Sequence, residues 1–343
     1  MTPVEKSNPS SGSAAYLPLW YGLGSFLLIW GWAESHGSHW WQLVTEWRLQ
    51  LAVIARAWFG AVAPIGSATL TLPVLLSDGQ LSPASFLMFS FAVQAVALTT
   101  GTTYILCRKL YIDWPVVRST VTGTIIGTPI GLLFLAPELS SILTISCYSI
   151  VWGSFGFAAL LWLRDRPAHQ FPPAAPNRML RKTSFACGLL GGLALSSVIG
   201  SGSTLPLYAV LVFLGRLDVK NAAATCTVIA AVNAWVGLIT LVFLRDFEPA
   251  AFQLWLAVAP AAALSVPLAW AVADRIRPQA TLSLAALCCL VQAGWLLIET
   301  REQLPIVGQM YVLAGLAGGV FVFRLLYLLG VVTSQPLSQP DNS

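Results

Sequence analysis

Charged residues are scarce in this 343-residue sequence, since Asp, Glu, Lys and Arg make up only 9% of it. A typical soluble domain carries about 25%. The longest hydrophilic stretch, 164–184, is too short to form a domain of its own. This scarcity excludes a soluble globular fold. A basic surface with interleaved aromatic residues is also missing, so nucleic acid is not an expected partner.

Motifs for nucleotide, metal and redox chemistry are missing as well. The sequence contains no G-x-x-x-x-G-K-[ST] loop, the sequence that cradles nucleotide phosphates. Its six cysteines form no pair of C-x-x-C motifs at metal-binding spacing. His36 and His39 have helical spacing but no carboxylate partners nearby. We therefore expect no metal, no cofactor and no enzymatic activity.

Hydrophobic residues make up 57% of the sequence, and the mean hydropathy is +0.75. A helix needs about 20 apolar residues to cross a bilayer, and runs of that size recur along the chain. The sequence thus predicts an all-α polytopic membrane protein, with a multi-pass location in the cell (inner) membrane. Its ten apolar segments are 16–33, 51–77, 84–106, 115–136, 139–163, 185–214, 221–244, 249–273, 279–298 and 305–330.

An internal repeat is visible on the two sides of the hydrophilic stretch. Residues 71–73 and 204–206 both read T-L-P, and I-G-T-P-I at 126–130 corresponds to L-S-V-P-L at 264–268. The offsets are 133 and 138 positions, and self-similarity at so nearly constant an offset indicates a repeated structural unit. The predicted divisions are an N-terminal tail, extra helix and external loop at 1–50, a first repeat at 51–163, a cytoplasmic linker at 164–184, a second repeat at 185–298, and an extra helix and tail at 299–343.

The segment that opens each repeat is interrupted at its centre by Gly, Pro and hydroxyl residues, at 64–73 and at 199–206. Proline removes a helical hydrogen bond and glycine loosens the backbone. Unpaired backbone inside a membrane is tolerated only where it packs in protein or lines a polar cavity. Paired interruptions in two halves indicate a transporter's binding site. Close helix packing through small residues is the alternative reading, and it requires no ligand.

Two topologies follow from these segments. If all ten segments span the membrane, twelve of the 18 Lys and Arg residues lie on one side and six on the other. The termini then lie on the side with six. If the two interrupted segments are re-entrant, the split becomes fourteen on the side of the termini against four. The positive-inside rule favours the second topology. It predicts two inverted repeats, each opening with a broken or re-entrant helix pair, and cytoplasmic termini.

The interrupted segment of the second half resembles a motif of the sulfite exporter TauE/SafE family, the toluene sulfonate uptake permeases. That family carries two copies of a G-x-G-G-G-x-x-x-P pattern, and residues 198–206 correspond to the second copy. A glycine and a polar turn at 215–220 follow, and then Ala222–Cys226 in place of the family's A-x-x-T-S run. The first copy is degenerate, with Ser67–Thr69 at the glycine triplet. The resemblance covers roughly residues 51–298 and implies a secondary carrier of sulfite or an organosulfonate.

Half-helices that begin inside the membrane direct free N–H groups and a positive dipole end at an anion. Hydroxyl and amide side chains on neighbouring segments can add neutral donors. Cys226 is either a contact for a sulfur anion or a small packing residue. The candidate substrate-binding residues are Gly66, Ser67, Thr69, Pro73, Ser90, Gln94, Gly200, Ser201, Gly202, Ser203, Thr204, Pro206, Thr225, Cys226 and Asn233.

The expected partners are a small anionic substrate and the lipid bilayer; the sequence leaves the oligomeric state open, with a homo-oligomer as one alternative. Other readings remain open at this point: a carrier of another small anion, a non-transporting membrane subunit of a complex, or a membrane enzyme. The sequence does not identify the anion, the direction of transport, the coupling ion or a role for the first and last helices.

Overall fold

The computed structural model describes residues 13–37, 40–62, 81, 83–136, 141–164, 178–200, 202–215, 217–244, 247–302 and 304–333. Every regular element in these ranges is a helix, and three of them are π-helical (η2, η4 and η5). The elements are η1 (Ser13–Tyr16), α1 (Leu17–Gly37), α2 (Trp40–Thr45), α3 (Trp47–Val62), α5 (Pro83–Cys107), α6 (Trp114–Ile130), η2 (Gly131–Leu135), α7 (Ser141–Arg164), α8 (Arg178–Leu190), η4 (Gly191–Ser196), α9 (Ser197–Ile199), α10 (Leu205–Ala209), η5 (Val210–Leu214), α11 (Val219–Leu244), α12 (Pro249–Ala273), α13 (Pro278–Thr300) and α14 (Ile306–Thr333).

Seven helices among the described residues are long and apolar enough to cross a membrane, which confirms a polytopic helical membrane protein. They correspond to predicted segments and have few charged residues. Their spanning parts are 85–107, 114–135, 146–164, 219–244, 249–273, 278–298 and 306–329.

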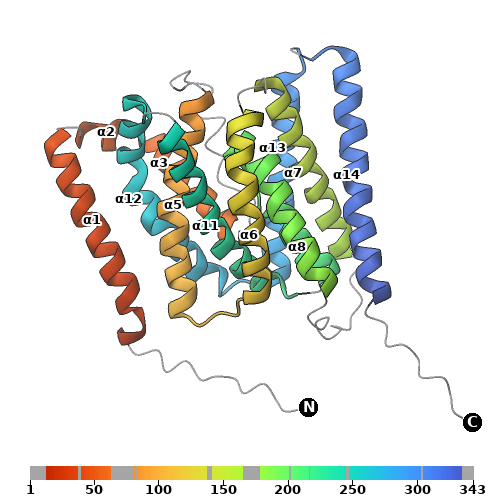
Figure 1. Cartoon of the computed structure of the whole chain (residues 1–343), viewed down its shortest axis with the longest axis horizontal. Coiled ribbons are helices and arrows are strands. Elements are labelled where there is room, and N and C mark those ends of the chain that lie inside the picture. The colour runs from red at the N-terminus through yellow and green to blue at the C-terminus, as the bar shows by residue number, and fades with distance from the viewer. Residues whose placement is uncertain are drawn as a thin grey trace, which may run out of the picture.

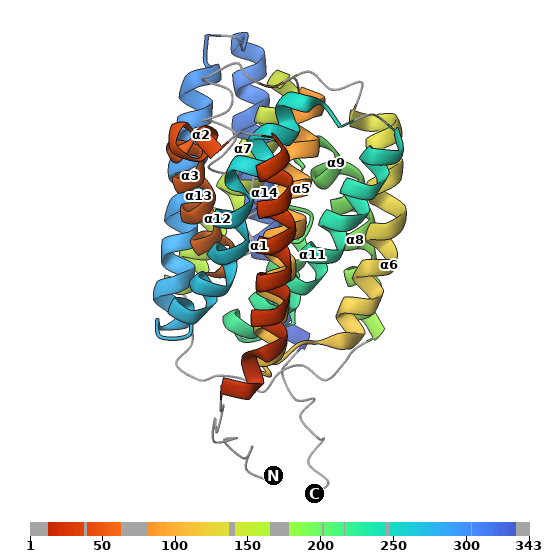
Figure 2. The same cartoon turned by 90° about the vertical axis from the view of Figure 1, so that its left-hand side faces the viewer.

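The helices form one bundle in which α1 begins and α14 ends at the same end, the lower end in Figure 1. Helix α12 packs against α3 and α5, and α6 packs against α8 and α11. Helices α7 and α13 pair with each other, and α14 lies outside α7. In Figure 2, α1 lies at the outer side of α12 and α5.

Two boundaries differ from the predicted ones. The segment predicted to begin at residue 185 begins as α8 at Arg178, because a hydropathy pattern marks where a helix becomes apolar rather than where it starts. The stretch 34–50, predicted as a loop, is largely helical, since α1 runs to Gly37 and is followed by α2 and by α3 from Trp47.

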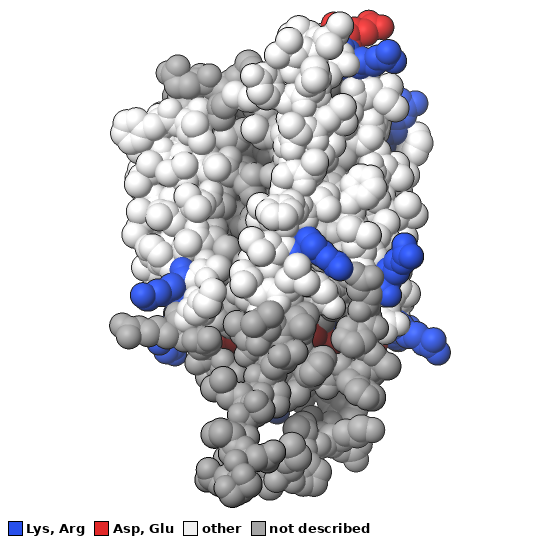
Figure 3. Space-filling model, turned by 90° about the vertical axis from the view of Figure 1, so that its right-hand side faces the viewer, with Lys and Arg blue, Asp and Glu red and all other residues white. Residues whose placement is uncertain are grey.

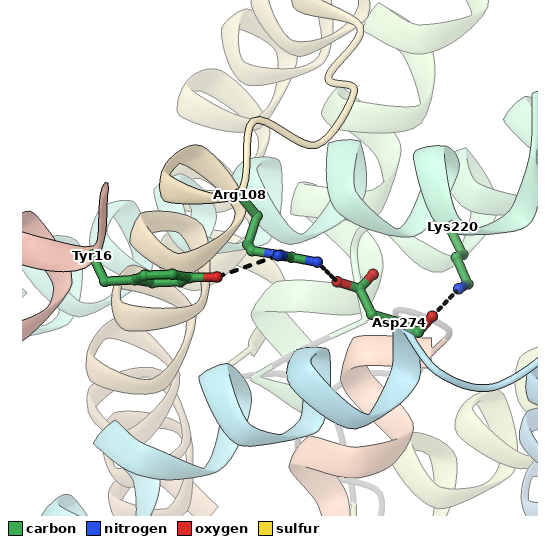
Figure 4. Close-up of polar contacts among 4 residues, drawn as sticks. All are labelled: Tyr16, Arg108, Lys220 and Asp274. Atoms are coloured by element: carbon green, nitrogen blue, oxygen red, sulfur yellow. Dashed lines mark hydrogen bonds and ion pairs between the residues drawn. The ribbon is translucent and has the colours of Figure 1, made fainter. Parts of the chain in front are cut away.

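A polar cluster joins four segments at the lower end of the bundle (Figure 4). The Arg108 guanidinium at the end of α5 forms an ion pair with the Asp274 carboxylate after α12, at 3.1 Å. It also donates a hydrogen bond to the Tyr16 hydroxyl at 3.4 Å. The Lys220 ammonium of α11 donates to the Asp274 backbone carbonyl at 3.0 Å. The pKa of Arg108 is raised, chiefly by its hydrogen bond to Tyr16 and to a smaller extent by that to Asp274, while burial has the opposite effect.

Helices α6 and α8 run parallel along a seam of glycines. A Cβ atom placed on Gly123 or Gly127 of α6 would meet the backbone of α8, and one on Gly188 would meet the backbone of Thr120. The Ser119 hydroxyl donates to the Arg181 carbonyl at 2.7 Å, close to the starts of both helices. Missing side chains let helix backbones approach closely, which is the usual packing device inside membranes.

The outer surface carries a broad uncharged band. Figure 3 shows it on the side of the bundle where α14 lies, with Lys and Arg side chains gathered toward the lower end and a smaller charged group at the upper end. Exposed apolar side chains of α14 include Ile306, Tyr311 and Phe321, which are 77%, 73% and 68% exposed. Such a band between charged ends matches the hydrocarbon layer of a bilayer.

Candidate functional site

The site is built on an interruption of the helix that follows the hydrophilic stretch in the middle of the sequence. Helix α8 continues through η4 and α9 and stops at Gly200, whose φ is +70°, and Gly202 follows with a φ of +82°. Glycine is the residue that adopts this left-handed region without strain. The chain resumes a helix after Thr204, with Pro206 in the first turn, where its missing N–H group costs nothing.

Both ends of the interrupted segment lie at the lower end of the bundle. Arg181 of α8 contacts Ser119 near the start of α6, and Lys220, just past the segment, contacts Asp274. The interruption itself lies much higher, because Thr128 at its side is fourteen residues along α6 from Trp114, a rise of about 21 Å. The chain therefore rises into the bundle and returns to the same end. Its interpretation as a re-entrant hairpin within a membrane stays a prediction.

Helix α5 binds the carbonyl group that the interruption sets free. The Ser90 hydroxyl donates to the Gly200 carbonyl at 3.1 Å, and the Gln94 amide donates to the same oxygen. Gln94 donates further to the Ser90 carbonyl at 3.0 Å. Ser90 and Gln94 are 1% and 5% exposed. A buried carbonyl without partners would be costly, so these two side chains hold the turn in place.

Asn233 of α11 links three other segments at the interruption. Its side-chain oxygen accepts a hydrogen bond from the Thr128 hydroxyl at 2.7 Å. Its amide nitrogen donates to the hydroxyls of Ser196 at 2.6 Å and Ser203 at 3.0 Å. All four side chains are between 0% and 3% exposed. Since both amide hydrogens are used, Asn233 positions its neighbours, and Ser196 and Ser203 retain their own hydroxyl hydrogens to donate.

Aromatic side chains of α7 close the interruption on another side. A Cβ atom on Gly202 would lie 2.5 Å from Cζ2 of Trp152. Trp152 stacks on Tyr148 with ring centroids 4.1 Å apart, and Phe155 contacts Tyr208 of α10 at 5.9 Å. Each of these four rings is 0% exposed. The indole therefore lies against the bare backbone of Gly202, where only glycine leaves room for it.

The backbone at the turn leaves hydrogen-bond donors available. The N–H groups of Gly200 and Leu205 donate to carbonyls within the segment. Those of Gly202, Ser203 and Thr204 have no acceptor among the described residues. The Cys226 thiol of α11 lies 3.8 Å from the Thr204 carbonyl oxygen. The arrangement provides neutral donors around a buried turn.

The structure brings together eight of the predicted site residues at this turn: Ser90, Gln94, Gly200, Gly202, Ser203, Thr204, Cys226 and Asn233. Pro206 lies in the first turn of α10, two residues after Thr204. The predicted residues Gly66, Ser67, Thr69, Pro73 and Ser201 lie outside the described residues.

Thr225 is a further predicted site residue, eight positions before Asn233 on α11, but it lies near the lower end of the bundle. Its hydroxyl donates to the Asn221 carbonyl at 2.9 Å and accepts from the Asp113 backbone N–H at 3.1 Å. Eight residues of a helix span about 12 Å. Thr225 and Asn233 therefore contact different segments even where they lie on the same side of α11.

Sequence reasoning missed three residues at the turn: Thr128, Ser196 and Trp152. Thr128 precedes the proline of the repeated I-G-T-P-I motif, and Ser196 directly precedes the interruption, so both carried a signal in the sequence. Trp152 carried none, because a tryptophan in an apolar helix reads equally well as facing lipid. Among the described residues, no group of three or more His, Cys, Asp or Glu could hold a metal ion.

A multi-span helical protein with a buried, polar-supported interruption in one half has the architecture of a membrane transporter. The family model for the sulfite exporter TauE/SafE family matches residues 49–296. The chain belongs to this family of transporters, as the motif at 198–206 predicted. No curated protein and no solved structure matches the chain.

Proposed function

We propose that this protein is a secondary carrier that moves a small sulfur-containing anion, such as sulfite or an organosulfonate, across the cell membrane. The observation that carries the proposal is the turn at Gly200–Thr204, which is buried inside an apolar bundle yet supported by hydroxyl and amide groups from α5, α6 and α11. Membership of the sulfite exporter family supports the substrate class.

The anion is bound by neutral donors in this proposal. The candidate donors are the N–H groups of Gly202, Ser203 and Thr204 and the hydroxyl hydrogens of Ser196 and Ser203, two side chains that both contact the buried Asn233 amide. Oxygen atoms of a sulfite or sulfonate accept such hydrogen bonds, which are stronger for a charged acceptor. Donors without a full charge hold the anion loosely enough for release on the other side.

The remaining predicted site residues belong to the proposal as well. Gly66, Ser67, Thr69 and Pro73 open the first repeat in sequence, and Ser201 lies between the two glycines of the second. We propose that the first repeat contributes its interrupted segment to the same substrate path. Thr225 has a structural part in it, as a partner of the turn before α6.

We propose further that the two repeats are inverted and that both termini are cytoplasmic. Reciprocal packing supports this arrangement: α12 of the second repeat lies against α3 and α5 of the first, as α6 of the first lies against α8 and α11 of the second. The pairs α5 with α11 and α7 with α13 join corresponding elements. An excess of Lys and Arg on the side of the termini supports their orientation.

The test is flux of labelled sulfite and of a simple sulfonate into proteoliposomes that contain the purified chain. Gly202→Leu places a side chain against Trp152, whereas a Cβ atom added at Gly294 of α13 meets nothing within 4 Å, so Gly294→Leu serves as the matched control. We expect saturable flux in the unmodified protein and in the control, and none in Gly202→Leu.

Saturable flux retained in a folded Gly202→Leu variant would remove the turn as the substrate path. Flux of neither anion by the folded, unmodified protein would remove this substrate class, and other small anions would then be tested. Saturable flux by the purified chain alone would exclude a non-transporting subunit.

A further inference from the structure

The two repeats correspond residue by residue along their central helices. Gly101 of α5 corresponds to Gly237 of α11, 136 positions later, and Gly79 and Gly215 before these helices have the same offset. Pro129 of α6 corresponds to Pro267 of α12, with an offset of 138. Each polar residue at the turn therefore has a defined counterpart in the other repeat.

The counterparts of the polar residues carry no hydroxyl or amide. Ser90 corresponds to Cys226, Gln94 to Ala230, Thr128 to Val266 and Asn233 to Ala97. Cys226, Val266 and Ala97 are buried, at 0%, 4% and 2% exposed. Four positions support the turn of the second repeat with hydrogen bonds. Their four counterparts have side chains that cannot form the same hydroxyl and amide hydrogen bonds.

The two glycines with positive φ in the second interruption also have no glycine counterpart in the first. Gly200 and Gly202, both with positive φ, correspond to Ser67 and Thr69 at an offset of 133. A positive φ is uncommon for residues other than glycine and strained for a β-branched one. Sequence alone therefore disfavours the same turn in the first repeat.

From these pairs we infer that the anion site is one-sided. Of the two interruptions, only the second contacts the anion, and Thr128, Gln94 and Asn233 are positioning residues that set its affinity. The first repeat contributes only indirectly, through the positioning residues Gln94 of α5 and Thr128 of α6. This inference rests on the proposed function, and it assigns substrate specificity to one half of a two-fold architecture.

The reciprocal pair Thr128→Val and Val266→Thr tests the inference, since each exchange preserves side-chain volume. Thr128→Val removes the hydroxyl that Asn233 accepts from, so the buried amide oxygen loses its partner. We expect the KM for sulfite flux in proteoliposomes to rise about tenfold, with maximal flux within about twofold of the unmodified protein. Thr128→Ser, which keeps the hydroxyl, restores the KM. Val266→Thr leaves the KM within about twofold.

The thermal unfolding midpoint of each variant shows whether it folds. An equal rise in KM for Val266→Thr and Thr128→Val would overturn the one-sided site, as would a Thr128→Val variant with lower maximal flux and an unchanged KM. The proposed function fails differently, through a folded unmodified protein that transports neither sulfite nor a sulfonate, and the inference would fail with it.

Discussion

Substitution of Gly202 by alanine tests the conformation of the turn, because two separate effects, backbone strain and overpacking, should each destabilise the variant. The φ of +82° lies in the left-handed region, which costs a residue with a Cβ about 1–2 kcal/mol. The new methyl group would overlap the outer ring of the Trp152 indole, lying 2.5 Å from Cζ2 and closer still to Cη2, whereas ordinary contact begins at 3.4 Å, so the ring must move by more than 0.9 Å. Trp152 is fully buried and stacked on Tyr148, so such overpacking costs about 1–3 kcal/mol. We expect Gly202→Ala to lower the free energy of unfolding by about 2–5 kcal/mol.

A double-mutant cycle with Trp152→Phe separates the two costs. Phenylalanine lacks the outer indole ring that the methyl group meets. The double variant should therefore recover the stability lost to overpacking, while the stability lost to the positive φ stays lost. The coupling energy should be about 1–3 kcal/mol, measured by unfolding in mixed detergent micelles. Gly294→Ala is the control, since no atom lies within 4 Å of its added Cβ and alanine favours a helix.

Two results would refute this reasoning. An unchanged stability of Gly202→Ala would mean that the turn does not hold this backbone conformation against Trp152. Strictly additive effects in the cycle would mean that the ring and the glycine do not meet.

Three further predictions concern the supports of the bundle. Asn233→Leu removes three buried hydrogen bonds, and we expect a loss of more than about 2 kcal/mol of stability together with the loss of sulfite flux. Arg108→Gln should cost only about 0.5–1 kcal/mol, because the pair with Asp274 is partly exposed, and the exchange of both charges should recover part of it. Gly188→Ala places a methyl group 2.9 Å from Thr120 Cγ2 in the seam between α6 and α8, so we expect its thermal midpoint to fall, with about 1–3 kcal/mol lost.

Each of these three has an outcome that contradicts it. Normal flux in a stable Asn233→Leu variant would show that the amide does not organise the turn. A loss of several kcal/mol on neutralising Arg108 would show a more deeply buried pair. A Gly188→Ala variant with an unchanged midpoint would show that α6 and α8 do not meet through their backbones.

The elements of the fold that could be predicted from sequence are those that depend on local composition. Apolar runs identified the spanning helices, and the G-S-G-S-T run at 200–204 marked where one of them breaks. The buried amides of Gln94 and Asn233 were expected to need partners, and both form hydrogen bonds at the turn. These features are fixed by the cost of leaving polar groups unpaired in an apolar interior.

The partners themselves could not be predicted, because they depend on how distant segments pack. Thr128 reaches Asn233 across 105 positions, and Trp152 covers Gly202 from a helix with no polar pattern. Glu34 was read as the end of an apolar segment, yet its carboxylate is fully buried. A single sequence contains the period of each helix but not the rotation and depth at which helices meet.

The glycine seam has a mechanical consequence for any transport cycle. Helices α6 and α8 meet through backbone at Gly123, Gly127 and Gly188, so no flexible side chains lie between them to absorb sliding. Close-packed contacts of this kind exchange between discrete arrangements rather than deforming gradually. We expect the two helices to move as one rigid body that carries Ser196 and Thr128 together. Exposure of the turn to either side of the membrane would then require motion of this body against α5 and α11, which contact the turn through the hydrogen bonds of Ser90, Gln94 and Asn233.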